Sequence, residues 1–121
     1  MNRETELLGA FGEHMAAMYL EKKHNKLLAM NVVGRFGEID LIAQNWRFVV
    51  FVEVKLRKDA RVAQAREFVN QRKRDKIRMT ASMYLERHPN RRQPRFDVIE
   101  VYAPEGYHTA HPEIYHLEDA F

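Results

Sequence analysis

Residues 48–56 constrain the fold more than any other part of the chain. They read FVVFVEVKL, a nearly unbroken run of β-branched, aromatic and aliphatic residues. Side chains alternate between the two faces of a strand, and here both faces are apolar as far as Glu53. A strand of this kind is covered on both sides, so the sequence predicts a central strand in a sheet flanked by helices.

Apolar periodicity predicts the remaining elements. We expect helices at residues 4–23 and 66–87, and strands at residues 27–33, 38–43, 47–56, 96–102 and, at an edge, 114–117. Short turns between the first three strands favour antiparallel hairpins, whereas the second helix forms a crossover that lets the next strand return parallel. The sequence therefore predicts one α/β domain over residues 1–121, with an αβββαβ core and a mixed central sheet.

The first predicted helix has two faces that suit burial. Spacings of three and four give an apolar stripe of Leu7, Leu8, Phe11, Met15, Met18 and Tyr19. A second flank consists of the small residues Gly9, Gly12, Ala16 and Ala17. Small residues let a helix lie close against a sheet, so the two glycines suggest close packing or a functional approach.

Charge is distributed unevenly along the chain. Residues 55–95 hold 14 Lys and Arg against 4 Asp and Glu, whereas residues 96–121 hold none against 6. Clustered positive charge favours binding to a polyanion, because contacts with phosphates release the counterions bound to it. The pattern favours a nucleic-acid partner, and a solvated basic helix face is the alternative.

The composition also bears on compartment. There is no cysteine, which excludes disulfides and thiolate chemistry. No apolar run approaches the roughly 20 residues of a membrane helix, and no secretory signal is visible. We expect a cytoplasmic protein without a membrane partner.

Acidic residues on two neighbouring strands carry the candidate chemistry. Glu53 and Lys55 share one face of the central strand, and Asp40 lies inside the preceding strand, where aspartate is disfavoured. A hairpin brings Asp40 beside Glu53, and two close carboxylates repel unless one is protonated or a cation lies between them. Asp40, Glu53 and the carbonyl of Val54 are oxygen ligands that suit Mg²⁺ or Mn²⁺. A Glu53–Lys55 ion pair is the simpler alternative.

Lys55 beside such a cation has a plausible role in catalysis. Its ammonium group can stabilise charge on a phosphate, or orient the attacking water and help to deprotonate it. Glu13, on the small flank of the first helix, is a further candidate, with a surface glutamate as the alternative interpretation.

The spacing of Asp40 and Glu53-Val54-Lys55 resembles the D…(D/E)xK signature of restriction-endonuclease-like nucleases. Over almost the whole length, the chain also resembles the YraN family of bacterial proteins. The segments that carry this resemblance are GAFGEHMAAMYL (9–20), Asn31, GEIDLIA (37–43), FVEVKLR (51–57), Lys73 with the helix after it, RFDVIEV (95–101) and HLEDAF (116–121). Such proteins often carry an arginine two residues after the Asn31 position, where this chain has Val33.

The resemblance implies a fold similar to that of archaeal Holliday-junction resolvases. It implies a site of Glu13, Asp40, Glu53 and Lys55, with Lys73, or less favoured Gln71, as an auxiliary polar residue. The resulting hypothesis is a metal-dependent endonuclease acting on nucleic acid, DNA more than RNA. The alternatives are an inactive nucleic-acid-binding module of the same fold and a protein-interaction domain. Proteins of this fold often form homodimers, and a homodimer is compatible with all three hypotheses.

Basic residues after the site are expected to hold the nucleic-acid backbone. They are Arg57, Lys58, Arg61, Arg72, Lys73 and Lys76. Trp46 lies at the turn of the predicted hairpin, where packing over the hairpin is favoured over stacking on a base. Asp97 and Glu100 fall on opposite faces of a strand and are expected to be structural.

Overall fold

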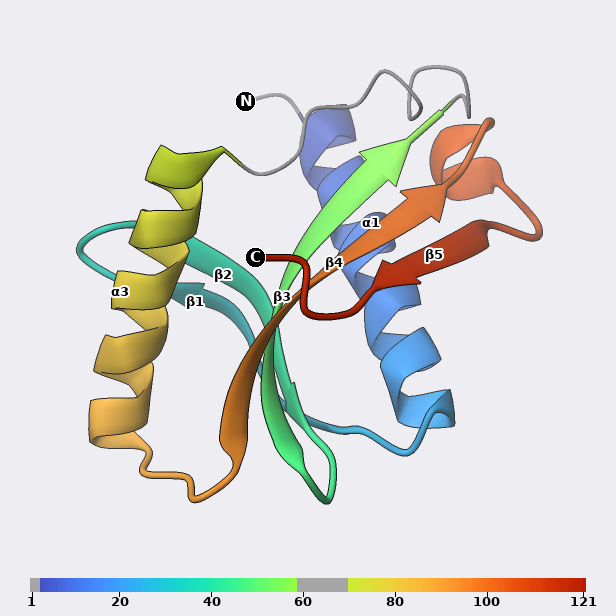
Figure 1. Cartoon of the computed structure of the whole chain (residues 1–121). Helices are drawn as coiled ribbons and strands as arrows, with labels where there is room; N and C mark the ends of the chain where they lie inside the picture. Colours follow the sequence, from blue (N-terminus) through green and yellow to red (C-terminus); the bar gives the residue numbers. More distant parts are fainter. Residues whose placement is uncertain (1–2, 59–69) are drawn as a thin grey trace.

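The predicted central strand lies in the middle of a five-stranded sheet (Figure 1). The computed structural model describes residues 3–58 and 70–121. Along the chain the elements are α1 (Arg3–Lys22), β1 (Lys26–Val33), β2 (Glu38–Gln44), β3 (Phe48–Arg57), α3 (Gln71–Arg87), β4 (Gln93–Tyr102), the short 3₁₀ helix η1 (Gly106–His108) and β5 (Glu113–Leu117). This order confirms the predicted α/β fold and its αβββαβ core.

The sheet is mixed, as predicted, and its strands follow the order β1-β2-β3-β4-β5. β1, β2 and β3 pair antiparallel, whereas β4 returns parallel to β3 after α3 and pairs with it from Phe48–Gln93 to Arg57–Tyr102. β4 begins three residues earlier than predicted, and Pro94 lies within it. β5 pairs only with residues 98–102 of β4, so at Pro94 β4 has a neighbouring strand on one side only. Proline lacks a backbone N–H, and the lack is tolerated there because no second strand needs that donor.

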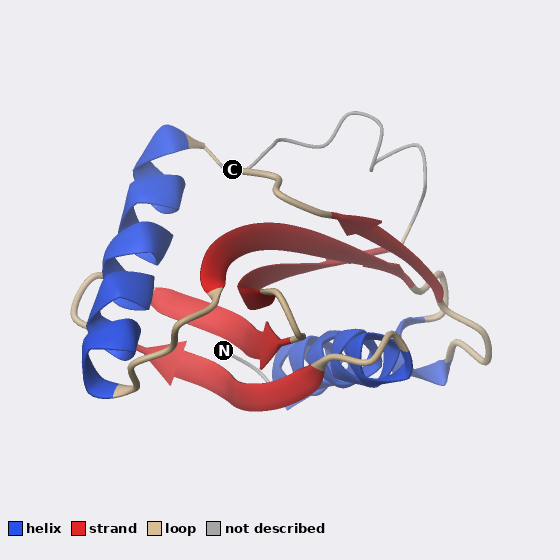
Figure 2. Ribbon diagram, turned by 60° about the horizontal axis from the view of Figure 1, so that its bottom comes forward, coloured by secondary structure: helices blue, strands red, loops and turns tan. Residues whose placement is uncertain are grey.

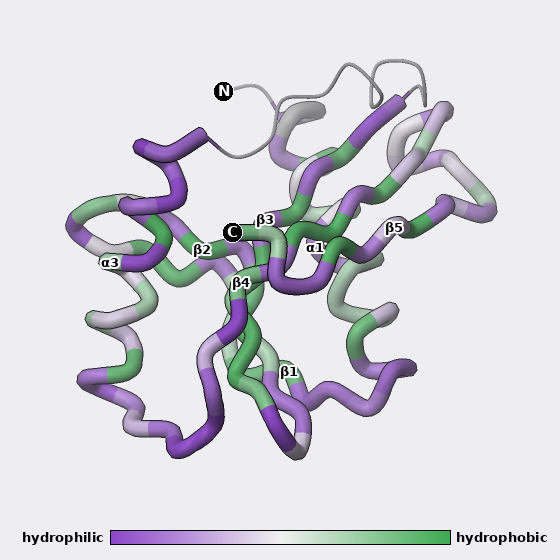
Figure 3. Tube along the Cα trace, in the orientation of Figure 1, coloured by the Kyte–Doolittle hydropathy of each residue, from purple (hydrophilic) through white to green (hydrophobic). Residues whose placement is uncertain are grey.

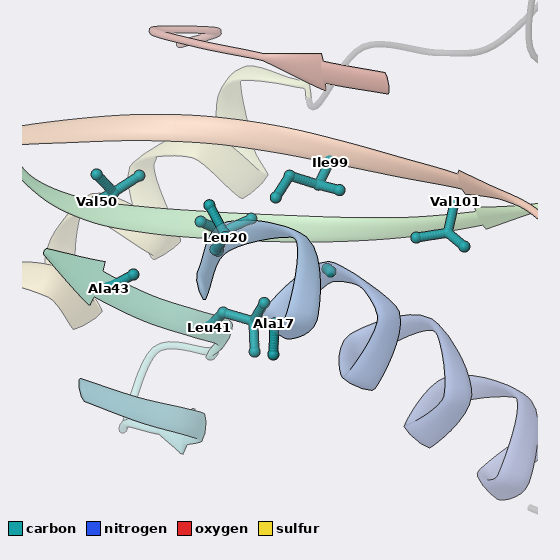
Figure 4. Packing of buried hydrophobic residues seen from close by; sticks show 9 residues of the cluster. Ala17, Leu20, Leu41, Ala43, Val50, Ile99 and Val101 are labelled. Atoms are coloured by element: carbon teal, nitrogen blue, oxygen red, sulfur yellow. The ribbon is translucent and has the colours of Figure 1, made fainter. Parts of the chain in front are cut away.

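A separate apolar cluster covers each face of the sheet. Figure 2 shows the twist of the sheet and the two long helices beside it. On one face, α1 packs through Ala16, Ala17 and Leu20 on Leu41, Ala43, Val50, Val52, Ile99 and Val101 (Figure 4). On the other face, α3 packs through Ile77 and Ala81 on Ile39, Ile42, Val49 and Phe51. β3 supplies buried residues to both clusters, which is why both of its faces are apolar.

The side of α1 that faces the sheet combines Ala16 and Ala17 of the small flank with Met15 and Tyr19 of the apolar stripe. Ala16 and Ala17 are buried, whereas Leu7 and Met18 of the predicted stripe are 44% and 41% exposed. Apolar periodicity alone does not show which of these residues face the sheet, because both sets are compatible with burial. A Cβ at Gly12 would lie in ordinary contact with Leu56 and Val54 of β3, and Gly9 has nothing near it, so packing requires glycine at neither position.

The second predicted helix is described from Gln71 onward, and its expected first part, including Phe68 and Val69, lies outside the described residues. None of the described helices has the length and apolar character needed to cross a membrane.

Candidate active site

Asp40 lies where β2 and β3 stop pairing. The ladder between these strands runs from Gln44–Val49 to Leu41–Val52 and ends there. Just beyond it, the backbone N–H of Val54 donates to Oδ2 of Asp40 at 2.8 Å. The carboxylate thus takes the position of a missing strand neighbour, and this hydrogen bond holds it between the two strands.

Strict alternation along β2 would place Ile39 and Leu41 on the same face, but they lie on opposite faces of the sheet. Ile39 packs in the α3 cluster and Leu41 in the α1 cluster. Opposite this segment, between the partners of Leu41 and Ile39, Asn31 of β1 has a left-handed backbone with φ 50°. Asp40 lies at the point where the alternation of side chains along β2 breaks.

Glu53 is nearly buried, at 7% exposure, and two ammonium groups compensate its charge. The Nζ atoms of Lys55 and Lys73 lie 3.2 Å and 2.5 Å from its Oε1. Lys73 comes from the first turn of α3, where its backbone N–H donates to the N-cap side chain of Asn70 at 2.9 Å. The cap fixes the start of α3 and hence the position from which Lys73 reaches the sheet.

Four carboxylates from α1, β2 and β3 influence one another. Burial raises the pKa of Asp40 to about 7, helped by the charge of Glu53 and, more weakly, of Glu13 and Glu38, while the Val54 amide acts in the opposite direction. Burial also raises the pKa of Glu13, with further contributions from Glu38 and Glu53 against a hydrogen bond from Asn31. The predicted approach of Asp40 to the Glu53 region is therefore present, with the repulsion that a cation would relieve.

Lys73 remains protonated in this environment. Burial alone would lower the pKa of Lys73, but the hydrogen bond and the charge of Glu53 outweigh it and raise the pKa. The site thus combines two carboxylates with raised pKa values, Glu13 and Asp40, with a lysine, Lys73, that stays positively charged.

The donor set is suited to a hard divalent cation. Mg²⁺ in proteins is commonly bound through one or two carboxylates together with substrate phosphates and water. Asp40 and Glu53 supply two such carboxylates, and both lysine contacts fall on the same oxygen of Glu53. No cluster of three or more His, Asp or Glu side chains suited to a metal occurs among residues 3–58 and 70–121, so a shell here depends on these two carboxylates, a backbone carbonyl and water.

A cavity of about 520 Å³ lies beside the site, between the β1–β2 turn and α3. Three of the predicted nucleic-acid contacts line it, namely Arg72, Lys73 and Lys76, together with Phe36, Gly37, Glu38, Asn70 and Ile77. The first turns of α3 are hydrophilic, in contrast to the middle of the sheet (Figure 3). The cavity offers clustered positive charge immediately next to the carboxylates.

The other predicted contacts lie elsewhere. Lys58 is exposed just after β3. Arg57 faces the buried carboxylate of Glu100, with 3.7 Å between Nε and Oε2. Arg61 lies outside the described residues.

Sequence reasoning did not name Glu38 and Asn70 as site residues. Glu38 lines the cavity and acts electrostatically on Asp40 and Glu13. Its position two residues before Asp40 was the available signal. Asn70 precedes a helix and is a typical N-cap residue, but the predicted helix start at residue 66 concealed it.

A second polar cluster on β4 holds the fold together. Buried Asp97 accepts hydrogen bonds from Nε and Nη2 of Arg95 at 2.9 Å and 2.8 Å and from the Asp119 amide at 2.9 Å, and it lies 2.6 Å from Nε2 of His116. These hydrogen bonds outweigh burial and lower the pKa of Asp97. His116 in turn contacts the Tyr19 hydroxyl through Nδ1, so the cluster links β4 and β5 to α1. Asp97 and Glu100 are both buried and both paired with arginine, as expected for structural residues.

Comparisons with known proteins place the chain in a family. A UPF0102 protein from Syntrophomonas wolfei subsp. wolfei is 39% identical over 123 residues, which covers 100% of both chains. UPF0102 proteins from Caldanaerobacter subterraneus subsp. tengcongensis and Pelotomaculum thermopropionicum are 43% and 38% identical over 103 and 117 residues, covering 84% and 96% of this chain and 83% and 96% of their own. The sequence profile described as "Uncharacterised protein family UPF0102" matches residues 12–101, which include all four carboxylates and both lysines of the site. These matches confirm the resemblance to the YraN family, and the chain belongs to the UPF0102 family.

Proposed function

We propose that this protein is a Mg²⁺- or Mn²⁺-dependent endonuclease that hydrolyses phosphodiester bonds in nucleic acid, with DNA favoured over RNA. The observation that supports the proposal most is the convergence of Asp40 and Glu53 with Lys55 and Lys73 beside a cavity lined with basic residues. Carboxylates whose pKa is raised by burial and by a neighbouring carboxylate are concentrated at active sites, which supports the proposal alongside this geometry.

The proposed reaction is hydrolysis with in-line displacement. Water adds to phosphorus while the bond to the 3′ oxygen breaks, leaving a 3′-hydroxyl and a 5′-phosphate. A cation bound by Asp40, Glu53 and the Val54 carbonyl would supply Lewis acidity and favour deprotonation of water. Glu13 lies within electrostatic range of Glu53 and can accept a hydrogen bond from a water molecule in the site.

The lysines act on charge and on orientation. Lys55 and Lys73 present ammonium groups next to Glu53, where each can stabilise the negative charge that develops on the phosphoryl oxygens. Arg72 and Lys76 in the adjoining cavity hold the neighbouring backbone phosphates without reading sequence. We therefore expect cleavage selected by nucleic-acid structure and not by base sequence.

The experiment is a cleavage panel with branched, single-stranded and duplex substrates in Mn²⁺ or Mg²⁺. Asp40→Ala and Glu53→Ala should each abolish cleavage while binding, followed by fluorescence anisotropy in EDTA, is largely retained. Glu86→Ala removes an exposed carboxylate on α3 and serves as the matched control with normal activity. If the unaltered protein cuts no substrate in either metal, the endonuclease proposal is wrong.

One observation favours a second candidate, a nucleic-acid-binding module without catalysis. Lys73 and Lys55 already compensate the charge of Glu53 without a cation. In that case Asp40→Ala should leave binding unchanged, and Mg²⁺ should not alter the melting temperature of the unaltered protein. A rise in melting temperature with Mg²⁺ that Asp40→Ala removes would exclude this candidate.

A further inference from the structure

The β2–β3 turn exposes the only tryptophan of the chain. Trp46 is 87% exposed, the most of any large hydrophobic residue that the structure describes. Packing over the hairpin was the favoured interpretation from the sequence, and the structure shows that it is wrong. Tryptophan is usually highly buried, and burial of its large ring contributes to stability. An indole this exposed gains none of that free energy in the isolated chain, which makes it a candidate for contact with a partner.

The turn that carries Trp46 is rigidly held. The side-chain oxygen of Asn45 accepts the backbone N–H groups of Arg47 and Phe48 at 2.9 Å and 2.8 Å. The Asn45 amide donates to Asn25 after α1, and its carbonyl accepts from Nε of Arg92 before β4. The indole is thus presented from a fixed backbone, which reduces the entropy lost when a partner binds it.

Positive charge surrounds the indole. A cavity of about 370 Å³ beside the turn is lined by Lys23, His24, Asn45, Trp46, Arg47, Phe48 and Arg95, none of them acidic. Arg95 is already paired with Asp97, but within the described part of the chain Lys23 and Arg47 form no salt bridge. We call Lys23, His24, Trp46 and Arg47 the hairpin surface.

The hairpin surface is separate from the candidate active site. Glu53 lies five positions after Phe48 along β3, about 17 Å of extended chain from the turn. Phe48 packs with the α1 cluster, whereas Glu53 contacts Lys73 of α3 on the other face. In Figure 1 the β2–β3 turn lies at the bottom of the molecule and the start of α3 at the top.

We infer that the hairpin surface binds single-stranded nucleic acid, with an unpaired base stacked on Trp46 and adjacent phosphates held by Lys23 and Arg47. An aromatic platform flanked by cations without carboxylates is the arrangement that such strands require, because every base has a π-face and every link carries a negative charge. An isolated indole is too small an apolar area for a stable protein or membrane interface. The inference rests on the proposed function only in taking nucleic acid as the partner.

The single tryptophan supplies the measurement. Titration of a short oligothymidylate into the full-length protein in EDTA should quench tryptophan fluorescence saturably, and a duplex should quench it less. Trp46→Ala should weaken binding of the oligothymidylate, followed by anisotropy, by roughly 5- to 100-fold. Trp46→Phe keeps an aromatic face and should therefore reduce the affinity for oligothymidylate less than Trp46→Ala does.

Charge variants complete the test. Lys23→Ala and Arg47→Ala should each reduce the slope of log affinity against log salt by about 0.7. Arg3→Ala removes an exposed positive charge at the other end of α1, about 28 Å away along the helix, and should change neither slope nor quenching.

Three outcomes would overturn the inference. Binding of oligothymidylate without quenching would place the strand elsewhere. Quenching by vesicles containing phosphatidylserine but not by the oligonucleotide would indicate a membrane surface, and a signal that depends on protein concentration alone would indicate a second copy. Glu53→Ala keeps this result separate from the endonuclease proposal, because it should lose cleavage and retain quenching.

Discussion

At the scale of single residues, Asp40 determines the electrostatics of the site. Its pKa of about 7 in the folded chain lies far above the ordinary value of 3.8. The folded state therefore binds a proton that the unfolded state releases between these two pH values. The contribution of Asp40 to stability is present below about pH 4 and is lost as the pH rises through 7.

Asp40→Asn should remove this pH dependence while keeping an oxygen that accepts the Val54 amide. We expect the variant to match the original protein near pH 4 and to exceed its unfolding free energy by on the order of 2 kcal/mol at pH 8. Urea unfolding in EDTA, followed by circular dichroism at both pH values, measures the difference. An equal effect at pH 4 and pH 8 would show that repulsion at Asp40 is not its cause.

The same variant tests the cation. Mg²⁺ should raise the melting temperature of the unaltered protein at pH 8, more weakly at pH 6 where protons compete for Asp40, and should have little effect on Asp40→Asn. Thermal unfolding with and without Mg²⁺ gives both comparisons. Stabilisation of the two proteins to the same extent would place the bound cation elsewhere.

Several of these residues could be identified from the sequence, and others could not. Glu53 and Lys55 stood out because charge interrupts an apolar strand, and Asp40 because aspartate is rare inside one. The hydrogen bond from Val54 to Asp40 was not foreseeable, because it forms where the β2–β3 ladder ends, and sequence periodicity does not show where a ladder ends. The exposure of Trp46 depends on which side chains surround the turn in space, and sequence periodicity carries no information about that.

At the scale of elements, the contact of α1 with β3 is set by small side chains. Ala16 is fully buried, whereas a Cβ added at Gly12 would lie 3.6 Å from Cδ1 of Leu56, an ordinary contact. We expect Gly12→Ala to raise the unfolding free energy by about 0.5–1 kcal/mol, because the helix gains propensity without a clash.

Ala16→Leu is the matched opposite case. A leucine there must fit between α1 and the sheet, and overpacking of this kind costs about 1–3 kcal/mol. Denaturant unfolding of both variants checks the pair. A destabilised Gly12→Ala would mean that α1 lies closer to β3 than the structure shows.

Element order was readable from the sequence because hairpin turns and long apolar stretches are local signals. Helix boundaries and helix faces were less so. The start of α3 depends on the Asn70 cap, and the buried face of α1 on the shape of the sheet it meets.

At the scale of the whole molecule, positive charge gathers beside the carboxylates, and the acidic segment lies in β4, β5 and the C-terminal residues after β5. If nucleic acid lies in the cavity beside α3, the double variant Arg72→Ala, Lys76→Ala should reduce the slope of log affinity for duplex DNA against log salt by about 2. Arg87→Ala, at the other end of α3, is the control. An unchanged slope in the double variant would show that the duplex does not occupy this cavity.

The crossover through α3 is expected to make the pairing of β4 with β3 form later than the hairpins of β1, β2 and β3. β1, β2 and β3 meet through short hairpins, whereas β4 pairs with β3 across 45 residues, from Phe48 to Gln93. Contacts so distant in sequence form later, because closing a long loop costs more entropy. Lys73 belongs to that loop, so a chain still emerging from the ribosome holds Asp40 and Glu53 without their lysine from α3. If the proposed endonuclease function holds, cleavage is expected only once α3 has packed on the sheet and brought Lys73 to Glu53.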